Sequence, residues 1–210
     1  TLLHQAQKAQ FAVPLFNIFE MTGLEDYFAA VEEKQAPAIT GMYATTFEKP
    51  NARAFAAAIR SFAEQCSVPV AMMLDHGGSP ELCLQAVEMG FTDVMYDGSK
   101  LPVQENIENT ARVVEAAHRN GVGVEAELGH VGSGKDYGDS DAVRAGYTDP
   151  AAVRHFVDET GVDMLAVAIG TAHGVYHGTP SLRIELLRTI RETVDIPLVL
   201  HGGSGLSEQQ

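Results

Sequence analysis

Short apolar runs alternate with longer amphipathic segments from one end of the chain to the other. The apolar runs predict seven strands, at residues 11–18, 38–41, 68–75, 92–96, 123–128, 163–169 and 196–200. The segments between them predict helices, at residues 23–35, 51–66, 80–89, 103–120, 150–160 and 181–193. Residues 129–146 are glycine-rich and polar and show no periodicity. Apolar strands that are each followed by an amphipathic helix are typical of an α/β protein with buried parallel strands.

The number of strand–helix units separates two architectures. Successive strands begin about 25 to 35 residues apart, which is the length of one βα unit. Seven units exceed what most small doubly wound sheets use and approach the eight of a TIM (β/α)8 barrel. The first strand runs into NIFEMTG (17–23), which lacks the glycine fingerprint of a dinucleotide-binding sheet. We therefore predict one TIM-barrel domain over residues 1–210, with the eighth βα unit missing at its C-terminal end, in preference to a doubly wound sheet.

Composition and charge restrict the partners. The chain has 210 residues, 45% of them hydrophobic, and a formal net charge of −14 at pH 7. A charge this negative argues against nucleic acids and anionic membranes, because both would repel the protein. The longest apolar run, 164–169, is too short to cross a bilayer, and no basic segment followed by an apolar core opens the chain. With two cysteines, Cys66 and Cys83, that match no metal spacing, we expect a cytoplasmic protein in a reducing compartment.

Three histidines follow three different strands. His76, His173 and His201 each stand beside a glycine at the carboxyl end of a predicted strand. In a TIM barrel these ends form the active-site face, so the three imidazoles are expected to converge. Three imidazoles around an open fourth position are a catalytic zinc arrangement. We therefore predict a zinc site, although any one of these histidines taken alone is more often a hydrogen-bonded or capping residue.

Carboxylates gather at the same strand ends. Asp75 directly precedes His76 and is a candidate general acid or base, or else an acceptor that orients a histidine. Asp97 follows the fourth predicted strand, and Glu127 shares one face of the fifth strand with Glu125. We predict that Asp97 and Glu127 either orient the metal ligands or belong to a second metal position.

A glycine-rich turn follows the seventh strand. Consecutive glycines expose backbone N–H groups, and a serine adds a hydroxyl, which together suit a phosphate group. Phosphate sites in barrels often lie after strands seven and eight. The candidate phosphate- or substrate-binding residues are Gly202, Gly203 and Ser204 in this turn, with Gly174 after strand six and Asn17 in strand one.

Five motifs together resemble one enzyme family. They are LDHG (74–77), DGS (97–99), VEAELG (124–129), AIGTAHGVY (168–176) and LHGGSGL (200–206). In this order they resemble the class II, zinc-dependent ketose-bisphosphate aldolases, which include the fructose-1,6-bisphosphate and tagatose-1,6-bisphosphate enzymes. The likeness extends over nearly the whole chain.

The resemblance implies a TIM-barrel lyase that assembles as a homodimer or homotetramer. It implies that His76, His173 and His201 hold one Zn²⁺, which polarises the ketone of the substrate. It further implies that Gly174, Gly202 and Ser204 bind the phosphate, often with Na⁺ or K⁺, and that Asp75 exchanges the proton of the C4 hydroxyl. The products are dihydroxyacetone phosphate and glyceraldehyde 3-phosphate.

The sequence departs from the family at three positions. Lys135 stands where many members carry a glutamate that moves the proton at carbon, and Asp136 or Glu127 could replace it. Met73 stands where close relatives place a histidine, and Tyr43 where they place a small hydroxyl residue.

Two other functions stay open on sequence grounds. One is a Schiff-base aldolase, for which Lys100 is the one lysine just past a strand end. The other is a non-catalytic barrel that binds metal and sugar phosphate, which Lys135 favours. The sequence does not separate fructose from tagatose bisphosphate.

Overall fold

A computed structural model describes residues 1–136, 146–208 and 210 of the chain. These residues form two compact units: residues 1–97 with 112–124, and residues 98–111 with 125–210. The division between the units falls inside helix α6 (Val103–His118) and strand β5 (Gly123–Leu128). Each unit is described in turn.

The first unit contains four parallel strands in consecutive order. They are β1 (Leu15–Asn17), β2 (Ala38–Tyr43), β3 (Val70–Gly77) and β4 (Asp93–Tyr96). Leu15 pairs with Ile39 and Tyr43 with Asp75, so the carboxyl ends of β1, β2 and β3 lie at one edge. The amide of Gly123, the first residue of β5, donates to the carbonyl of Thr92 beside β4 (3.0 Å), which continues the series within this unit.

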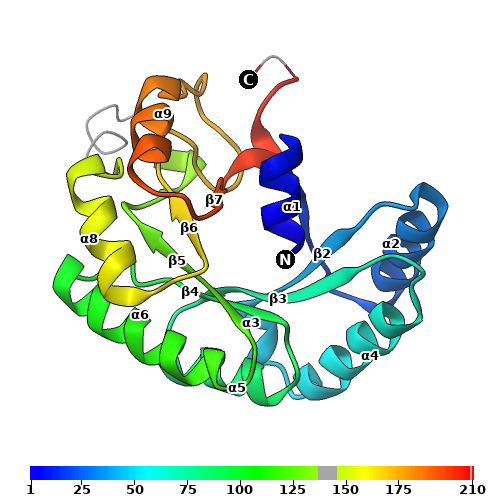
Figure 1. Cartoon of the computed structure of the whole chain (residues 1–210). Coiled ribbons are helices and arrows are strands. Elements are labelled where there is room, and N and C mark those ends of the chain that lie inside the picture. The colour runs from blue at the N-terminus through cyan, green and yellow to red at the C-terminus, as the bar shows by residue number, and fades with distance from the viewer. Residues whose placement is uncertain (137–145, 209) are drawn as a thin grey trace. The chain divides into compact units, whose positions relative to one another are not determined.

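The first unit has one helix before its first strand and further helices after its strands. They are α1 (Leu2–Ala9), α2 (Met21–Lys34), α3 (Ala44–Phe47), α4 (Ala52–Gln65) and α5 (Pro80–Glu88). Helices α2 and α4 lie side by side, and the rings of Phe28 and Phe62 stack between them with centroids 5.4 Å apart (Figure 1). Leu24 and Ile59 are fully buried, so the apolar faces of both helices form the core of this unit. Ser79 caps α5 by accepting from the amide of Leu82, with Pro80 in the first turn.

The second unit contains most of β5, with β6 (Met164–Val167) and β7 (Leu198–Val199), again parallel and in consecutive order. Glu125 pairs with Met164, and Leu165 pairs with Leu198. The N-terminal part of α6 (residues 103–111), the helices α8 (Pro150–Thr160) and α9 (Ile184–Thr193), and two 3₁₀ turns, η1 (Gly134–Asp136) and η2 (Gly203–Gly205), complete its regular structure within the described residues. Asp149 caps α8 by accepting from the amide of Ala151 (3.0 Å).

The predicted α/β fold is confirmed. Seven parallel strands run in chain order, without the reversal that a doubly wound sheet requires, so the chain is TIM-barrel-like. Whether residues 1–210 act as one domain stays a prediction. Cys66 and Cys83 are free thiols in this structure, and burial raises the pKa of Cys83 to about 12. Among the described residues, no helix combines the length and the apolar character needed to span a bilayer.

Several predicted boundaries were wrong. The first strand is three residues long, from Leu15, because Pro14 cannot donate to a ladder. The strand expected over 68–75 begins at Val70 and continues to Gly77. Helices α1 and α3 were not predicted, and of the aperiodic segment 129–146, residues 137–145 lie outside the described residues.

Two adjacent glycines provide a matched test of packing, because Gly77 is the last residue of β3 and Gly78 directly follows it. A Cβ on Gly77 would lie 2.6 Å from the carbonyl oxygen of Met95 and 2.8 Å from Sγ of Cys83, whereas a Cβ on Gly78 would meet nothing within 4 Å. We expect Gly77→Ala to lower the free energy of unfolding by about 1–3 kcal/mol through overpacking. Gly78→Ala should change it by less than about 0.5 kcal/mol. Urea denaturation of both variants checks this, and equal losses would contradict the packing described here.

Candidate functional site

The predicted site residues form two side-chain clusters, one in each unit. Asn17, Asp75, His76 and Asp97 belong to the first unit. Glu127, His173, Gly174, His201 and the turn Gly203–Gly205 belong to the second. Each cluster lies at the carboxyl ends of its own parallel strands, as the sequence predicted.

An irregularity in β3 brings Asp75 and His76 to the same side. Neighbouring residues of a regular strand point to opposite faces. Here the register between β3 and β4 shifts between Leu74 and Gly77, and His76 has a positive φ of 56°. As a result, Nε2 of His76 lies 3.9 Å from Oδ1 of Asp75. A non-glycine residue in this conformation costs about 1–3 kcal/mol, a strain that is common at functional sites.

Asp75 is held by an amide side chain. Its carboxylate is 5% exposed, and Oδ2 accepts a 2.7 Å hydrogen bond from Nδ2 of Asn17 in β1. Gly41 provides the space for this contact, because a Cβ there would lie 2.6 Å from Oδ1 of Asn17. The amide fixes one carboxylate oxygen and leaves Oδ1 on the side of His76.

His76 is oriented by a carboxylate and an aromatic ring. Its Nδ1–H donates to Oδ2 of Asp97 (2.9 Å), and the ring of Tyr43 packs against it edge-on, with centroids 5.7 Å apart. Since Nδ1 carries this bond, Nε2 is the nitrogen that can ligate a metal. Orientation of a metal ligand is one of the two roles predicted for Asp97, the other being a second metal position, and both stay predictions.

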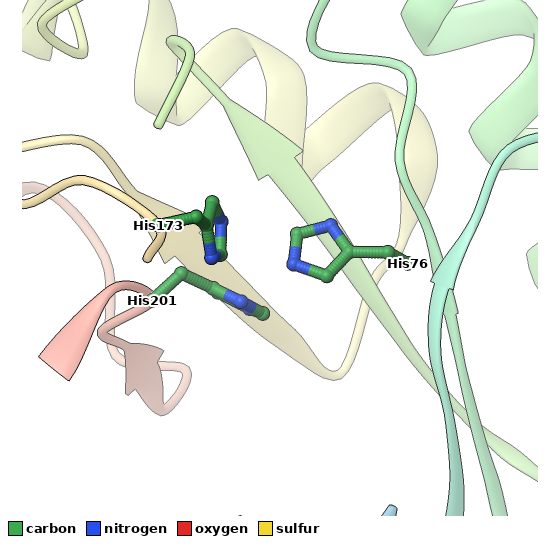
Figure 2. Close-up of side chains that lie close together, drawn as sticks. All are labelled: His76, His173 and His201. Carbon is green, nitrogen blue, oxygen red and sulfur yellow. The ribbon is translucent and has the colours of Figure 1, made fainter. Parts of the chain in front are cut away.

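The second cluster joins two histidines and a glutamate. The rings of His173 and His201, which follow β6 and β7, lie next to each other with centroids 5.7 Å apart (Figure 2). Each offers a ring nitrogen within 4.8 Å of the other. His201 Nε2–H donates to Oε1 of Glu125, which is 2% exposed, at 2.7 Å. Nδ1 of His201 is therefore the nitrogen that can bind a metal.

The main chain of His173 is fixed from the side of β5. Its N–H donates to the carbonyl of Gly132 (2.8 Å), and its carbonyl accepts from the amide of Gly134 (2.7 Å). This short parallel bridge centres on Ser133. It attaches the segment after β5 to the loop after β6.

Glu127 has a different environment from Glu125. It is buried, and Oε1 accepts from the amide of Val131 (2.9 Å) and lies 4.0 Å from Nδ1 of His130. His130 Nδ1 is also within hydrogen-bond distance of Oγ of Ser99 (3.0 Å). His130 was not among the residues selected from the sequence, because its contact with Ser99 of the DGS motif joins residues 31 positions apart.

The glycine-rich turn is accessible. Gly203 and Ser204 are exposed in η2, and Gly202 has a φ of 72°, which favours glycine. A Cβ on Gly202 would also lie 2.6–2.8 Å from backbone atoms of Ala172. The turn therefore packs its backbone directly on the loop that precedes His173.

The three departures from the family pattern have different surroundings. Lys135 is exposed in η1, and the side chain of Asp136 lies outside what the structure describes. Met73 is buried in β3. Tyr43 ends β2 and contacts His76, as described above.

The donor set fits a zinc ion. Neutral imidazoles are preferred zinc ligands, and a carboxylate on the second ring nitrogen fixes their tautomer and orientation. His76 has such a partner in Asp97, and His201 has one in Glu125.

The phenol of Tyr43 provides a test of the charges in the first unit. Burial and, to a smaller extent, the carboxylates of Asp75 and Asp97 raise its pKa above 10.0. In metal-free protein, the difference in tyrosinate absorbance between the parent and Tyr43→Phe reports the ionisation of Tyr43. We expect this absorbance to develop above pH 10, and we expect Asp97→Asn to lower the pKa of Tyr43. Because the phenol ionises at lower pH in the unfolded chain than in the folded chain, the free energy of unfolding should fall as the pH rises through 10. A titration at or below pH 10 would contradict the described burial.

Comparison with known proteins identifies the family of this chain. The family model for class-II fructose-bisphosphate aldolase matches residues 1–210. A fructose-bisphosphate aldolase from Geobacillus stearothermophilus is 40% identical over 214 residues, which is 100% of this chain and 73% of that protein.

Solved structures are also similar. The YdjI aldolase from Escherichia coli K12 matches with a TM-score of 0.87 and 35% identity, over 99% of this chain and 73% of that one. A structure from Coccidioides immitis, assigned as a fructose-1,6-bisphosphate aldolase, matches with a TM-score of 0.89 and 30% identity. The match covers 99% of this chain and 74% of that one. The chain belongs to the class-II fructose-bisphosphate aldolase family and is thereby a carbon–carbon lyase.

Proposed function

We propose that the protein catalyses the reversible, zinc-dependent cleavage of a ketose 1,6-bisphosphate into dihydroxyacetone phosphate and glyceraldehyde 3-phosphate. Fructose 1,6-bisphosphate is the first candidate substrate, because the matched family and the Geobacillus relative carry that name. Tagatose 1,6-bisphosphate, which differs in configuration at C4, is the second. The observation that carries the proposal is the buried Asp75 carboxylate beside a candidate ligand, His76.

Aldol cleavage requires a base at one defined hydroxyl. The C3–C4 bond breaks, its electron pair passes to C3 next to the C2 carbonyl, and the C4 hydroxyl loses its proton as the aldehyde forms. Asp75 is suited to accept that proton, because Asn17 occupies Oδ2 and leaves Oδ1 on the side of His76. In the direction of synthesis the same carboxyl returns the proton.

We propose His76, His173 and His201 as the ligands of one zinc ion. When bound, that ion would supply a Lewis acid for the ketone oxygen of the substrate. The first unit contributes an imidazole oriented by Asp97, and the second contributes one oriented by Glu125.

The exposed turn after β7 is our proposed phosphate site. Gly202, Gly203 and Ser204 lie directly after His201, and Gly174 lies directly after His173. Backbone N–H groups there would hold the phosphate and so fix the reacting carbons next to the ligands, with Na⁺ or K⁺ as a further charge partner.

The proton at C3 needs a second group, and we propose Glu127. Its carboxylate is buried in β5, two residues from Glu125. Lys135, at the position of the family's loop glutamate, is exposed in η1 and offers no carboxylate.

The same Lys135 favours a second candidate function, a barrel that binds metal and sugar phosphate without turnover. A measurable cleavage rate on either bisphosphate excludes it. Bound zinc with no turnover on both bisphosphates would favour it.

Metal dependence separates the proposal from a Schiff-base aldolase. We expect a chelator to abolish cleavage and zinc to restore it, with borohydride trapping no substrate on Lys100.

His173→Ala should lose stoichiometric zinc, measured by elemental analysis, while circular dichroism stays unchanged. His155→Ala, on the exposed face of α8, is the matched control and should keep both zinc and activity. Full zinc occupancy in His173→Ala would refute the ligand assignment.

The role of Asp75 predicts a loss in kcat. Asp75→Asn removes the proton acceptor, so kcat for fructose 1,6-bisphosphate should fall by about 100- to 10,000-fold, with zinc content unchanged. Asp158→Asn, on the surface of α8, controls for loss of one negative charge. Steady-state kinetics on both bisphosphates measures the effect, and a kcat within a factor of a few of the parent would disprove the assignment.

A further inference from the structure

The structure assigns to Tyr176 the role of a positioning residue that fixes the loops of His173 and His201 to each other. The inference lies within the second unit and rests on the proposed function only in taking these two histidines as metal ligands. Tyr176 stands in the loop after β6, three residues beyond His173.

The phenol oxygen of Tyr176 forms two hydrogen bonds, one to each loop. It accepts from the amide of Ala172 (2.7 Å) and donates to the carbonyl of Gly202 (2.9 Å). Ala172 directly precedes His173, and Gly202 directly follows His201. One hydroxyl therefore ties together the residues adjacent to both candidate ligands, which phenylalanine at this position could not do.

Close packing around the ring strengthens the link. A Cβ on Gly205 would lie 2.7 Å from Cδ2 of Tyr176, so the turn after β7 closes directly on the aromatic ring. Gly202 in turn approaches the backbone of Ala172, with a would-be Cβ 2.6 Å from its carbonyl oxygen. Although Tyr176 is half-buried and Gly205 is exposed, contacts this close leave little room for the two loops to shift against each other.

His201 depends on such a link more than His173 does. The loop of His173 is also held by Gly132 and Gly134. Strand β7 has only two residues, and its last paired residue, Val199, precedes His201 by two positions. Beyond that pair, the Glu125 carboxylate fixes the His201 ring, and Tyr176 fixes the adjacent backbone. Together they set the 5.7 Å separation of the two imidazole rings.

Tyr176→Phe tests the assignment, because it retains the ring and removes both hydrogen bonds. In metal-free protein we expect hydrogen exchange at the Ala172 amide to accelerate at least about tenfold, since its acceptor is lost. Zinc affinity, measured by competition with a chromogenic chelator, should weaken about tenfold, as on loss of other groups that orient metal ligands.

Tyr27→Phe is the matched control. Its hydroxyl donates to the carbonyl of Ile39 (3.2 Å) in the first unit, so it also removes a phenol bond to the backbone. Both variants should lower Tm by a few degrees, but Tyr27→Phe should leave zinc affinity unchanged.

Three results would overturn the assignment: unchanged exchange at Ala172, unchanged zinc affinity in Tyr176→Phe, or an equal loss of affinity in Tyr27→Phe. None of these readouts uses aldolase turnover. A protein that binds zinc and shows the expected exchange, but cleaves no bisphosphate, would therefore refute the proposed function and leave the role of Tyr176 standing.

Discussion

Hydrogen bonds between carboxylates and imidazoles are the constraint on which both halves of the site depend. Asp97 holds His76 in the first unit, and Glu125 holds His201 in the second. A histidine at a strand end can rotate about two side-chain torsions, so its position in the sequence does not fix its ring. The carboxylate removes that freedom and determines which nitrogen keeps its lone pair for a metal.

The same pairs gather negative charge near the strand ends. Asp75, Asp97, Glu125 and Glu127 each lie within 4.0 Å of a histidine ring nitrogen. Neutral imidazoles can donate hydrogen bonds to these groups but do not cancel their charge, and burial of uncompensated carboxylates is costly. A divalent cation held by the histidines would offset that cost. Metal binding is therefore expected to stabilise the strand ends as well as to serve the reaction.

The sequence predicted the placement of the candidate residues that follows from strand order. A polar residue that follows a buried parallel strand lies at the carboxyl end of that strand, which was enough to place Asp75, His76, His173 and His201 at strand ends, whereas their chemical roles stay predictions. It could not predict the irregularity at His76, because a positive φ is unusual for histidine and depends on pairing with β4. The contact between Asn17 and Asp75 could likewise not be predicted from the sequence, since 58 residues separate the two and no local pattern encodes their approach.

Packing acts together with the hydrogen bond at His76. The ring of Tyr43, at the position where the family pattern predicts a small hydroxyl residue, lies edge-on to the imidazole with the ring centroids 5.7 Å apart. The aromatic edge excludes water from that side of the ring, and a lower local dielectric favours the hydrogen bond from His76 to Asp97. Met73, the other departure in these strands, is buried in β3. Packing thus takes over part of the orientation that hydrogen bonds would otherwise provide. The geometry of the ligand can then be retained while the polar groups around it change.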